Sequence, residues 1–590
     1  MKTYRDLNPS SNVVLLESAS SVGGVWAKHR LYKGLKSNNM LGTYEFSDFP
    51  MTEEAFGVKP GQHIPGHVIQ MYMEKYAEHF GFTDRIRLET SVRSAEHRPD
   101  GTWLLTTASS REDSERTMVA KKMIVATGIT SQAYLPSFPG QEAFEAPLFH
   151  CRDLLEHEGQ VLHGGQKVAV FGGTKSAWDA VYASATSAVQ VEWVIRESGH
   201  GPIWMAPPYV TPLKKWLEKL VTTRFLTWFS PCIWGDADGF SGIRSFLHGT
   251  WLGRKTVDSF WSVLANDVVQ LNGYDAHPEV RKLKPWISPF WIASSLSILN
   301  YPTNFFDLVR DGKVRIHIAD IDHLSRNAVH LANGATLTDI SALICSTGWK
   351  ATPNIRFLPE GIDRELGFPW SQDPLDETLV RRADEEILRM FPKLRDQPTP
   401  NAQYRPLSDD APATASHPFR LARFMVPLSL VQERSIAFMG VTMTINTTLI
   451  AQTQALWVAA YFSGKLDIKP ALQCPADLKD TGTDTDSNAS VDLEKQPPQG
   501  KGRADDLDLA WETALHSEFG KYRYPGGFGR RNPDFVFDAL PYVDLLLRDL
   551  RLQTNRKGGV LAQCFAAHGV EDYRGLVEEW KMIPSTEYNS

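Results

Sequence analysis

The chain has 590 residues, of which 42% are hydrophobic and 22% charged, so it is long enough for several domains with ordinary globular cores. Its formal net charge of -7 and pI near 6.2 exclude the overall basic field that holds a nucleic-acid backbone. The five cysteines are too scattered for a CxxC pair or a zinc knuckle, which favours a reducing compartment. The sequence contains neither an apolar run of roughly 18 residues nor the apolar stretch of a signal peptide at its start. We therefore expect a cytoplasmic protein and leave a peripheral membrane contact open.

Residues 1–160 contain two runs that are typical of buried parallel strands. Asn12–Glu17 is a short aliphatic run that ends in an acid, and a second run ends in the Ala-Thr-Gly of 126–128. Between them, the apolar residues of 69–80 follow the 3.6-residue spacing of a helix, and a polar turn at 99–101 predicts a hairpin. These alternating elements predict an α/β domain.

A second βαβ unit is predicted within residues 161–335. Lys167–Gly173 is a buried strand that meets a glycine turn, a helix-compatible run follows from Lys175, and Val191–Arg196 is the next strand. Inside this unit, segment 201–301 is rich in tryptophan and resembles amphipathic helices, so we interpret it as an inserted helical cap. It holds eight of the 17 tryptophans, at positions 204, 216, 228, 234, 251, 261, 286 and 291.

The last third of the chain divides into three parts. Residues 336–478 return to sheet and complete the α/β body. Residues 479–504 are poor in large apolar side chains and rich in Asp, Ser, Gly and Pro, which predicts a flexible linker. Residues 505–590 are expected to form a separate helical extension.

The glycine turn at 172–177, GGTKSA, follows a strand and opens a helix. In this position backbone N–H groups at a helix N-terminus can meet a pyrophosphate. The usual middle glycine is a threonine here, so the backbone would approach the phosphates less closely, and an ordinary tight turn without a ligand remains the alternative. The expected phosphate contacts are Gly172, Thr174, Lys175 and Ser176.

Arg196 stands at the end of the strand that follows this turn. An acid at this place selects the ribose hydroxyl of NAD, whereas a guanidinium suits the 2′-phosphate of NADPH through paired hydrogen bonds. Lys175 would add positive charge nearby. The sequence therefore favours NADPH, and an exposed strand-end arginine without a ligand is the alternative.

The first unit carries motifs that resemble a known family. Glu17 ends its strand where a carboxylate accepts from ribose hydroxyls, and GGVW follows at 23–26. With FSDFP at 46–50, ATG at 126–128 and STGW at 346–349, the chain resembles flavin-containing monooxygenases and their Baeyer–Villiger relatives. The resemblance implies an α/β flavoprotein with two Rossmann-like domains that bind FAD and NADP. In that scheme 1–160 and 336–478 are two parts of the FAD domain, and 161–335 is the NADP domain with its cap.

The same resemblance implies the site residues. Asn38 in LKSN would donate a hydrogen bond to the flavin or the nicotinamide, with Asn39 as its rival. His150, in a partial match to the family's F-x-G-x-x-x-H fingerprint, would couple NADP binding to domain motion, or else be a buried histidine bonded to backbone. The expected FAD contacts are Glu17, Gly23, Gly24, Val25, Trp26, Val92, Thr127, Gly128, Thr347 and Gly348.

One expected element is missing from the first unit. The residues before Asn12 are too few for the first strand and the GxGxxG turn that a dinucleotide fold begins with. Losing a central strand would leave neighbouring backbone groups unpaired, at about 1–3 kcal/mol for each buried group. Either the sequence is incomplete at its start, or the protein is a degenerate relative that no longer holds FAD.

These motifs together predict a monooxygenase that uses FAD, NADPH and molecular oxygen to insert one oxygen atom into a small organic substrate. The aromatic cap suggests an apolar substrate, such as an intermediate of secondary metabolism. A non-catalytic relative is the alternative. A disulfide reductase is disfavoured, because no cysteine pair lies close to either expected cofactor turn.

Overall fold

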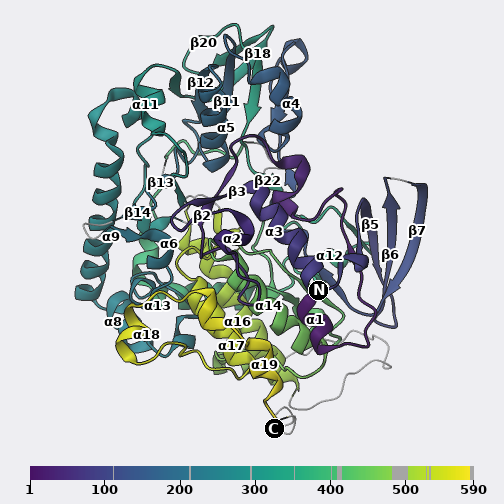
Figure 1. Ribbon diagram of the computed structural model, residues 1–590. Coiled ribbons are helices and arrows are strands. Elements are labelled where there is room, and N and C mark those ends of the chain that lie inside the picture. The colour runs from purple at the N-terminus through teal and green to yellow at the C-terminus, as the bar shows by residue number, and fades with distance from the viewer. Residues whose placement is uncertain are drawn as a thin grey trace, which may run out of the picture.

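A five-stranded parallel sheet occupies the top of the molecule (Figure 1). The computed structural model describes residues 1–110, 112–210, 214–292, 296–350, 352–399, 401–407, 415–480, 502–525, 528–530 and 533–584. The strand order is β10 (Leu148–His150), β21 (Ala342–Cys345), β11 (Lys167–Phe171), β12 (Gln190–Ile195) and β17 (Val314–Ile318). This sheet and its helices confirm the predicted α/β class.

The predicted βαβ unit forms the centre of this sheet. β11 is apolar and buried from Val168 to Phe171, and helix α5 (Lys175–Thr186) covers it with fully buried Ala177, Trp178 and Val181. Trp178 meets Trp193 of β12 edge to face at 5.2 Å between ring centroids. The small side chain of Ala177 lets the helix approach the strand closely, as its place in the motif predicted.

The expected flavin-side strands form two separate parallel pairs. β1 (Leu15–Leu16) pairs with β4 (Ile86–Arg87), and β8 (Met123–Val125) pairs with β26 (Ile436–Phe438). No strand of the described part of the chain joins these pairs, so both outer edges of each pair are open. Ile124, in the middle of β8, is 39% exposed, although a central strand normally buries such a side chain.

An antiparallel sheet at the right of Figure 1 holds the predicted hairpin at 99–101, which joins β5 (Thr90–His97) to β6 (Trp103–Ser109). The sequence analysis did not anticipate the next strand, β7 (Glu112–Ala120), because its charged residues hide the alternation. The remaining strands of the body are β2 (Lys36–Met40), β3 (His63–Pro65), β9 (Gln132–Ala133), β18 (Ile321–Ser325), β19 (Ala328–Leu331), β20 (Thr336–Leu337), β22 (Trp349–Lys350), β23 (Arg356–Leu358), β24 (Leu421–Ala422) and β25 (Val426–Pro427).

The inserted cap is mainly helical, as predicted. Its longest helix, α9 (Trp251–Asn272), runs along the left edge of Figure 1. The cap also contains α6 (Leu217–Leu220), α7 (Arg224–Thr227), α8 (Ser241–Gly249), α10 (Pro278–Arg281) and the short strands β13 (Trp204–Ala206), β14 (Tyr209–Val210), β15 (Lys215–Trp216) and β16 (Leu296–Ile298).

The other helices surround the two sheets. The predicted helix of 69–80 is α3 (Gly66–His79), and the second part of the body contains the long buried helix α14 (Thr447–Phe462). The rest are α1 (Lys2–Leu7), α2 (Glu53–Phe56), α4 (Leu154–Val161), α11 (Phe305–Arg310), α12 (Ile362–Glu365), α13 (Glu377–Met390) and α15 (Ala476–Asp480). In the described ranges, no helix is both long and apolar enough to cross a bilayer.

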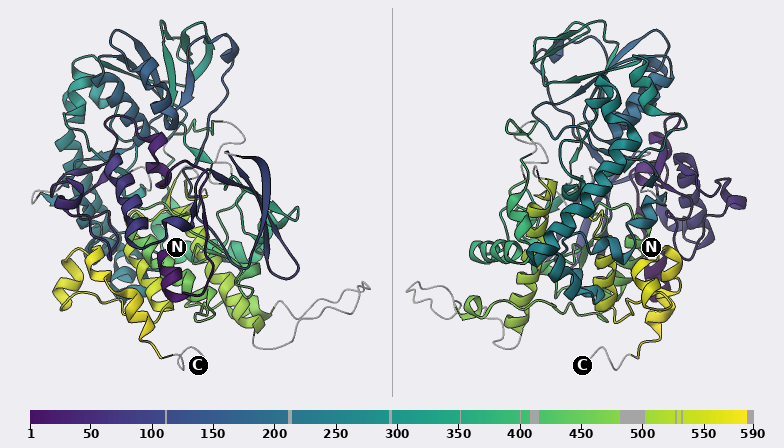
Figure 2. Two further views of the ribbon diagram at one scale, coloured as in Figure 1. Left: turned by 45° about the vertical axis from the view of Figure 1, so that its right-hand side comes forward. Right: turned by 90° about the vertical axis from the view of Figure 1, so that its left-hand side faces the viewer.

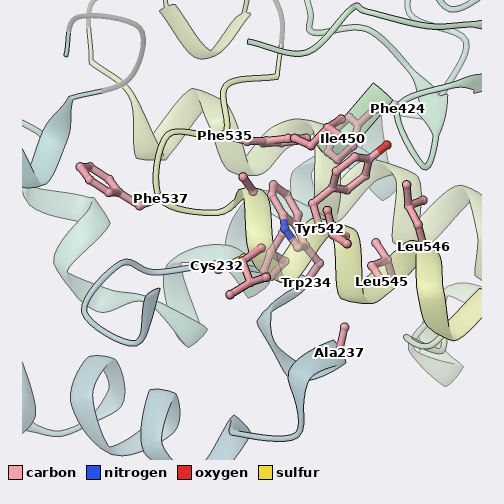
Figure 3. Packing of buried hydrophobic residues seen from close by; sticks show 14 of the residues in the cluster. Cys232, Trp234, Ala237, Phe424, Ile450, Phe535, Phe537, Tyr542, Leu545 and Leu546 are labelled. Atoms are coloured by element: carbon pink, nitrogen blue, oxygen red, sulfur yellow. The ribbon is translucent and has the colours of Figure 1, made fainter. Parts of the chain in front are cut away.

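The C-terminal helices are not a separate tail, which corrects the sequence-based expectation. α16 (Gly502–Arg523), α17 (Ala539–Asp549), α18 (Val560–Phe565) and α19 (Leu576–Lys581) lie against the body at the bottom of the molecule (Figures 1 and 2). Figure 3 shows Trp234 of the cap packed with Phe424 of the body and with Tyr542 of α17. Burying aromatic surface from all three parts makes the extension part of the core. The predicted linker, 479–504, lies mostly outside the described residues.

A buried ion pair joins the cap to the C-terminal extension. Arg224 of the cap and Asp544 of α17 are both fully buried, and the guanidinium Nη2 donates to the carboxylate at 2.9 Å. Burial raises the pKa of Asp544 to about 6, although Arg224 opposes this shift. Removing one partner would leave an uncompensated buried charge, so the pair forces the extension and the cap to fold together.

Candidate active site

The glycine turn at 172–173 lies at the carboxyl edge of the parallel sheet. Gly172 has a φ of +134°, and a Cβ there would lie 2.4 Å from the Ser346 carbonyl oxygen. A Cβ at Gly173 would lie 2.7 Å from the carbonyl oxygen of Gly201. Both positions therefore require glycine, and they let the end of β11 touch the end of β21. Ligands of open α/β sheets bind at this edge.

Helix α5 begins at this turn with Thr174 as its N-cap. The Thr174 side chain makes no capping hydrogen bond, so the first backbone N–H groups of the helix have no side-chain acceptor from this residue. The positive end of the helix dipole adds to the attraction for an anion. The expected contacts Gly172, Thr174 and Ser176 are thus grouped where a pyrophosphate would fit.

The ammonium group of Lys175 is not free to bind an anion at the carboxyl edge of the sheet. Its ammonium pairs with Asp179 one turn later and lies 5.0 Å from the centroid of the Tyr301 ring. The Tyr301 hydroxyl donates to the same carboxylate at 2.9 Å. Asp179 therefore offsets much of the positive charge that the sequence assigned to this position.

Arg196 follows β12, at the strand end where the sequence placed it. Its Nε lies 3.3 Å from an Asp320 carboxylate oxygen, and its Nη2 donates to Ser198 Oγ at 2.8 Å and to the Arg405 carbonyl at 2.5 Å. The Ser198 backbone N–H also donates to Asp320, at 3.1 Å. At the end of β12, the Arg196 guanidinium therefore lies in a hydrogen-bond network with the Asp320 carboxylate and the backbone of Arg405.

His150 ends β10, next to Cys345 of β21. The ring is only 2% exposed and packs edge to face on Trp349, 4.8 Å between centroids. Its Nδ1 accepts a hydrogen bond from the Arg152 backbone N–H at 3.2 Å, whereas Nε2 has no hydrogen-bond partner among the described residues. Burial lowers the pKa of His150 to about 4, so the ring is neutral near pH 7.

The two Thr-Gly turns meet across a short interface. β22, which follows Thr347 and Gly348, pairs with β9, which follows Thr127 and Gly128. The Tyr134 backbone N–H donates to the Gly348 carbonyl at 3.0 Å. Both turns have a positive φ at the glycine. The predicted contacts from the two halves of the α/β body are thus brought together.

The first loop holds the remaining expected flavin contacts. Glu17 directly follows β1, and its carboxylate accepts from the Ala19 N–H at 2.9 Å. The Gly23-Gly24-Val25-Trp26 segment forms a single turn of 3₁₀ helix, and the Trp26 Nε1 donates to the Tyr44 hydroxyl at 3.1 Å. Val92 lies farther away in β5, where its half-buried side chain packs on the core below the antiparallel sheet.

The structure separates the two asparagines that the sequence left as rivals. Asn39 is 7% exposed, and its Nδ2 lies 2.6 Å from Glu218 and 3.2 Å from the Ile445 carbonyl. Asn38 is half-buried on the other side of β2, where its side chain forms a hydrogen-bonded pair with Ser297 Oγ at 3.0 Å. Asn38 is the one less enclosed by protein.

Two arginines at this interface were missed by the sequence analysis. Arg30 lies 5.1 Å from the centroid of a Trp349 ring and donates to the Thr130 carbonyl at 3.2 Å. Burial, with the nearby positive charge of Arg152, lowers the pKa of Arg30 to about 10. Sequence position gave no signal for either, since an isolated arginine in a loop usually indicates a solvated surface.

Comparisons with known proteins place the chain in a family. A model of the flavin-binding monooxygenase-like family matches residues 7–229. The FAD-dependent monooxygenase resA of Aspergillus sclerotiorum is 32% identical, over 98% of this chain and 95% of its own length. An FAD-dependent monooxygenase of Pyrenophora dematioidea is also 32% identical, over 95% of this chain and 97% of its own.

Solved structures show the same fold at low identity. S-allyl-L-cysteine S-oxygenase from Allium sativum superposes with a TM-score of 0.50 at 13% identity, covering 100% of this chain and 92% of its own. Cyclohexanone monooxygenase from Rhodococcus sp. Phi1, solved with NADP+, gives 0.50 at 15% identity, covering 78% and 81%. By its full-length similarity to the fungal enzymes, this chain belongs to the family of flavin-binding monooxygenases.

Proposed function

We propose that this chain binds FAD and NADPH and inserts one atom of molecular oxygen into an apolar organic substrate. The other oxygen atom leaves as water, and NADPH with one proton supplies the two electrons and the hydrogens that this requires. When bound, FAD accepts the hydride of NADPH and passes the electrons to oxygen. The observation that carries the proposal is that the glycine turn, His150 and the Thr347-Gly348 turn lie at one sheet edge, which the pairing of β22 with β9 joins to the Thr127-Gly128 turn.

Two features of this edge fit a dinucleotide. At Gly172 and Gly173 the missing Cβ lets the backbone of Ser346 and Gly201 lie directly against the turn, which brings the end of β21 to the N-terminus of α5. His150 Nε2 and Ser346 Oγ are buried polar atoms without a hydrogen-bond partner in the described part of the chain. Because buried polar groups are normally paired, these atoms are suited to phosphate or ribose oxygens.

The protein's own residues would then position and protect the reaction. The N-terminus of α5 would hold the pyrophosphate of NADPH, and Arg196 its 2′-phosphate. Asn38 would donate to the reacting rings. The aromatic cap would exclude water, which limits wasteful release of hydrogen peroxide, and would favour an apolar substrate such as an intermediate of secondary metabolism.

One observation favours the alternative, a relative that does not hold FAD. The residues near Glu17 fit the ribose end of FAD, but the described residues include no strand and glycine turn between β1 and β8 to hold its pyrophosphate. We infer that a strand and glycine-rich turn joined ahead of α1 would pair with one open edge of each strand pair and raise FAD occupancy.

The test is purification of both forms in excess FAD. We expect the extended form to show the larger absorbance near 450 nm relative to 280 nm and to oxidise NADPH when substrate is added. Stoichiometric FAD in both forms would contradict the need for the added turn. A colourless extended form that leaves NADPH unoxidised would instead support the non-catalytic relative.

A further inference from the structure

Within its own sheet, the middle of β2, which carries Asn38, is held by one side-chain contact, between His63 Nδ1 of β3 and the Asn38 carbonyl at 2.9 Å. β2 pairs with β3 only at its two ends, Lys36 with Pro65 and Met40 with His63, and the register shifts between them. A shifted register leaves the central residues without regular ladder bonds. The position of Asn38 therefore depends on side chains from other elements.

Glu218 of the cap contacts β2 at the two residues that follow Asn38. Its Oε1 accepts from Asn39 Nδ2 at 2.6 Å and from the Thr43 hydroxyl at 2.7 Å. Its Oε2 accepts from the Met40 backbone N–H at 3.0 Å and from Trp216 Nε1 at 2.9 Å. Three of the four donors belong to β2 or to the turn after it.

This carboxylate has no cation to pair with. Glu218 is 3% exposed, and no Lys, Arg or His of the described residues forms an ion pair with it. Burial raises the pKa of Glu218, while the four donors oppose that shift. Burying a charge without a counter-ion is costly unless hydrogen bonds replace its water, and here all four come from donors aimed at it.

The opposite end of the cap holds β2 from its other side. Asn300 Nδ2 lies 3.0 Å from the Lys36 carbonyl and 3.1 Å from the Ser37 carbonyl, and Ser297 bonds the Asn38 side chain. The strand thus lies between the start and the end of the cap insertion.

We propose that Glu218 is a positioning residue, which fixes the central part of β2 and thereby the Asn38 side chain from the cap. The catalytic consequence of this inference rests on the proposed function, whereas the contact between Glu218 and β2 is independent of it. Glutamine would be a poor substitute, because it offers one acceptor and two donors to four donors. This role differs from simple support of the cap. A positioning residue predicts that its loss displaces Asn38 while the cap remains folded.

The first experiment needs no cofactor. Hydrogen exchange of segment 36–43 is compared in the full chain, in Glu218→Gln and in Glu218→Ala. We expect the Met40 amide to exchange at least tenfold faster in both variants, with α9 unchanged. The matched control is Glu279→Gln, a cap carboxylate whose partners, Lys282 and the Ile316 N–H, lie away from β2. Unchanged exchange at Met40 in both Glu218 variants would overturn the proposal.

The second experiment uses the FAD-loaded protein. We expect Glu218→Gln to raise the peroxide released per NADPH several-fold and to lower kcat for product, with the KM for NADPH within twofold of the parent. Peroxide yield equal to that of Glu279→Gln would reject the positioning role. If the parent oxidises no NADPH, the proposed function fails, while the exchange experiment still decides whether Glu218 fixes β2.

Discussion

Replacing Arg196 by alanine tests how the chain selects its coenzyme. The guanidinium is 16% exposed and is fixed by Ser198, Asp320 and the Arg405 carbonyl, so it is held in place before any ligand arrives. A charge-assisted hydrogen bond contributes about 1.5–3 kcal/mol, which corresponds to a loss of NADPH affinity of about 10–150-fold. NADH, which lacks the 2′-phosphate, should lose little.

Asp320→Asn provides the opposite perturbation at the same network. The Asp320 carboxylate would repel a 2′-phosphate, so its neutral analogue should tighten NADPH binding while leaving NADH unchanged. The assay is a titration of each variant with NADPH and with NADH at fixed salt, in which binding is measured by the quenching of tryptophan fluorescence. If Arg196→Ala weakened both coenzymes equally, Arg196 would not contact the 2′-phosphate, and the coenzyme assignment would fail.

Three further changes probe the sheet edge and the cap. Gly172→Ala should destabilise the fold by about 2–6 kcal/mol in urea denaturation, because a φ of +134° and a Cβ 2.4 Å from Ser346 each cost about 1–3 kcal/mol; wild-type stability would show that the turn relaxes freely. Substituting Trp204 or Trp228 by alanine should raise peroxide per NADPH more than it lowers NADPH oxidation, and a flat yield would assign the cap another role. The pKa of His150 is lowered from 6.5 to about 4, so the ring binds a proton less tightly in the folded chain than in the unfolded chain. The contribution of His150 to folding stability is therefore complete above about pH 6.5 and is lost as pH falls toward 4. His150→Gln should therefore show a shallower loss of stability over that range, by at most about 3 kcal/mol, and an unchanged slope would mean that the ring is accessible to protons in the fold.

The βαβ unit could be predicted from sequence because its signals are local. An uninterrupted apolar strand, a glycine pair and a small residue at Ala177 each indicate the same structure. The hairpin at 99–101 was predictable for the same reason. A local pattern also placed Arg196 at a strand end, whereas His150 was predicted from the family resemblance, and the structure shows that it ends β10 of the same parallel sheet.

The remaining features depend on contacts between distant segments. Residue spacing could not separate Asn38 from Asn39. The difference between them arises because Asn39 is enclosed by Glu218, which is 179 residues later in the chain. Arg224 and Asp544 each look like surface residues in sequence, and only their encounter makes burial possible. The separate tail was wrongly predicted because a polar linker says nothing about where the next helix docks.

The union of the cap with α17 has a consequence for how the protein is made. Arg224 and Asp544 are 320 residues apart, so at ribosomal rates of about 5–20 residues per second the cap waits about 15–60 s for its partner. During that time Arg224 has only Asp238 of the cap, 3.6 Å away, as an ion-pair partner, and a set of large aromatic rings faces water in an unfinished chain. A chain that stops before α17 would keep those groups exposed, which makes shortened products natural targets for chaperones and proteases.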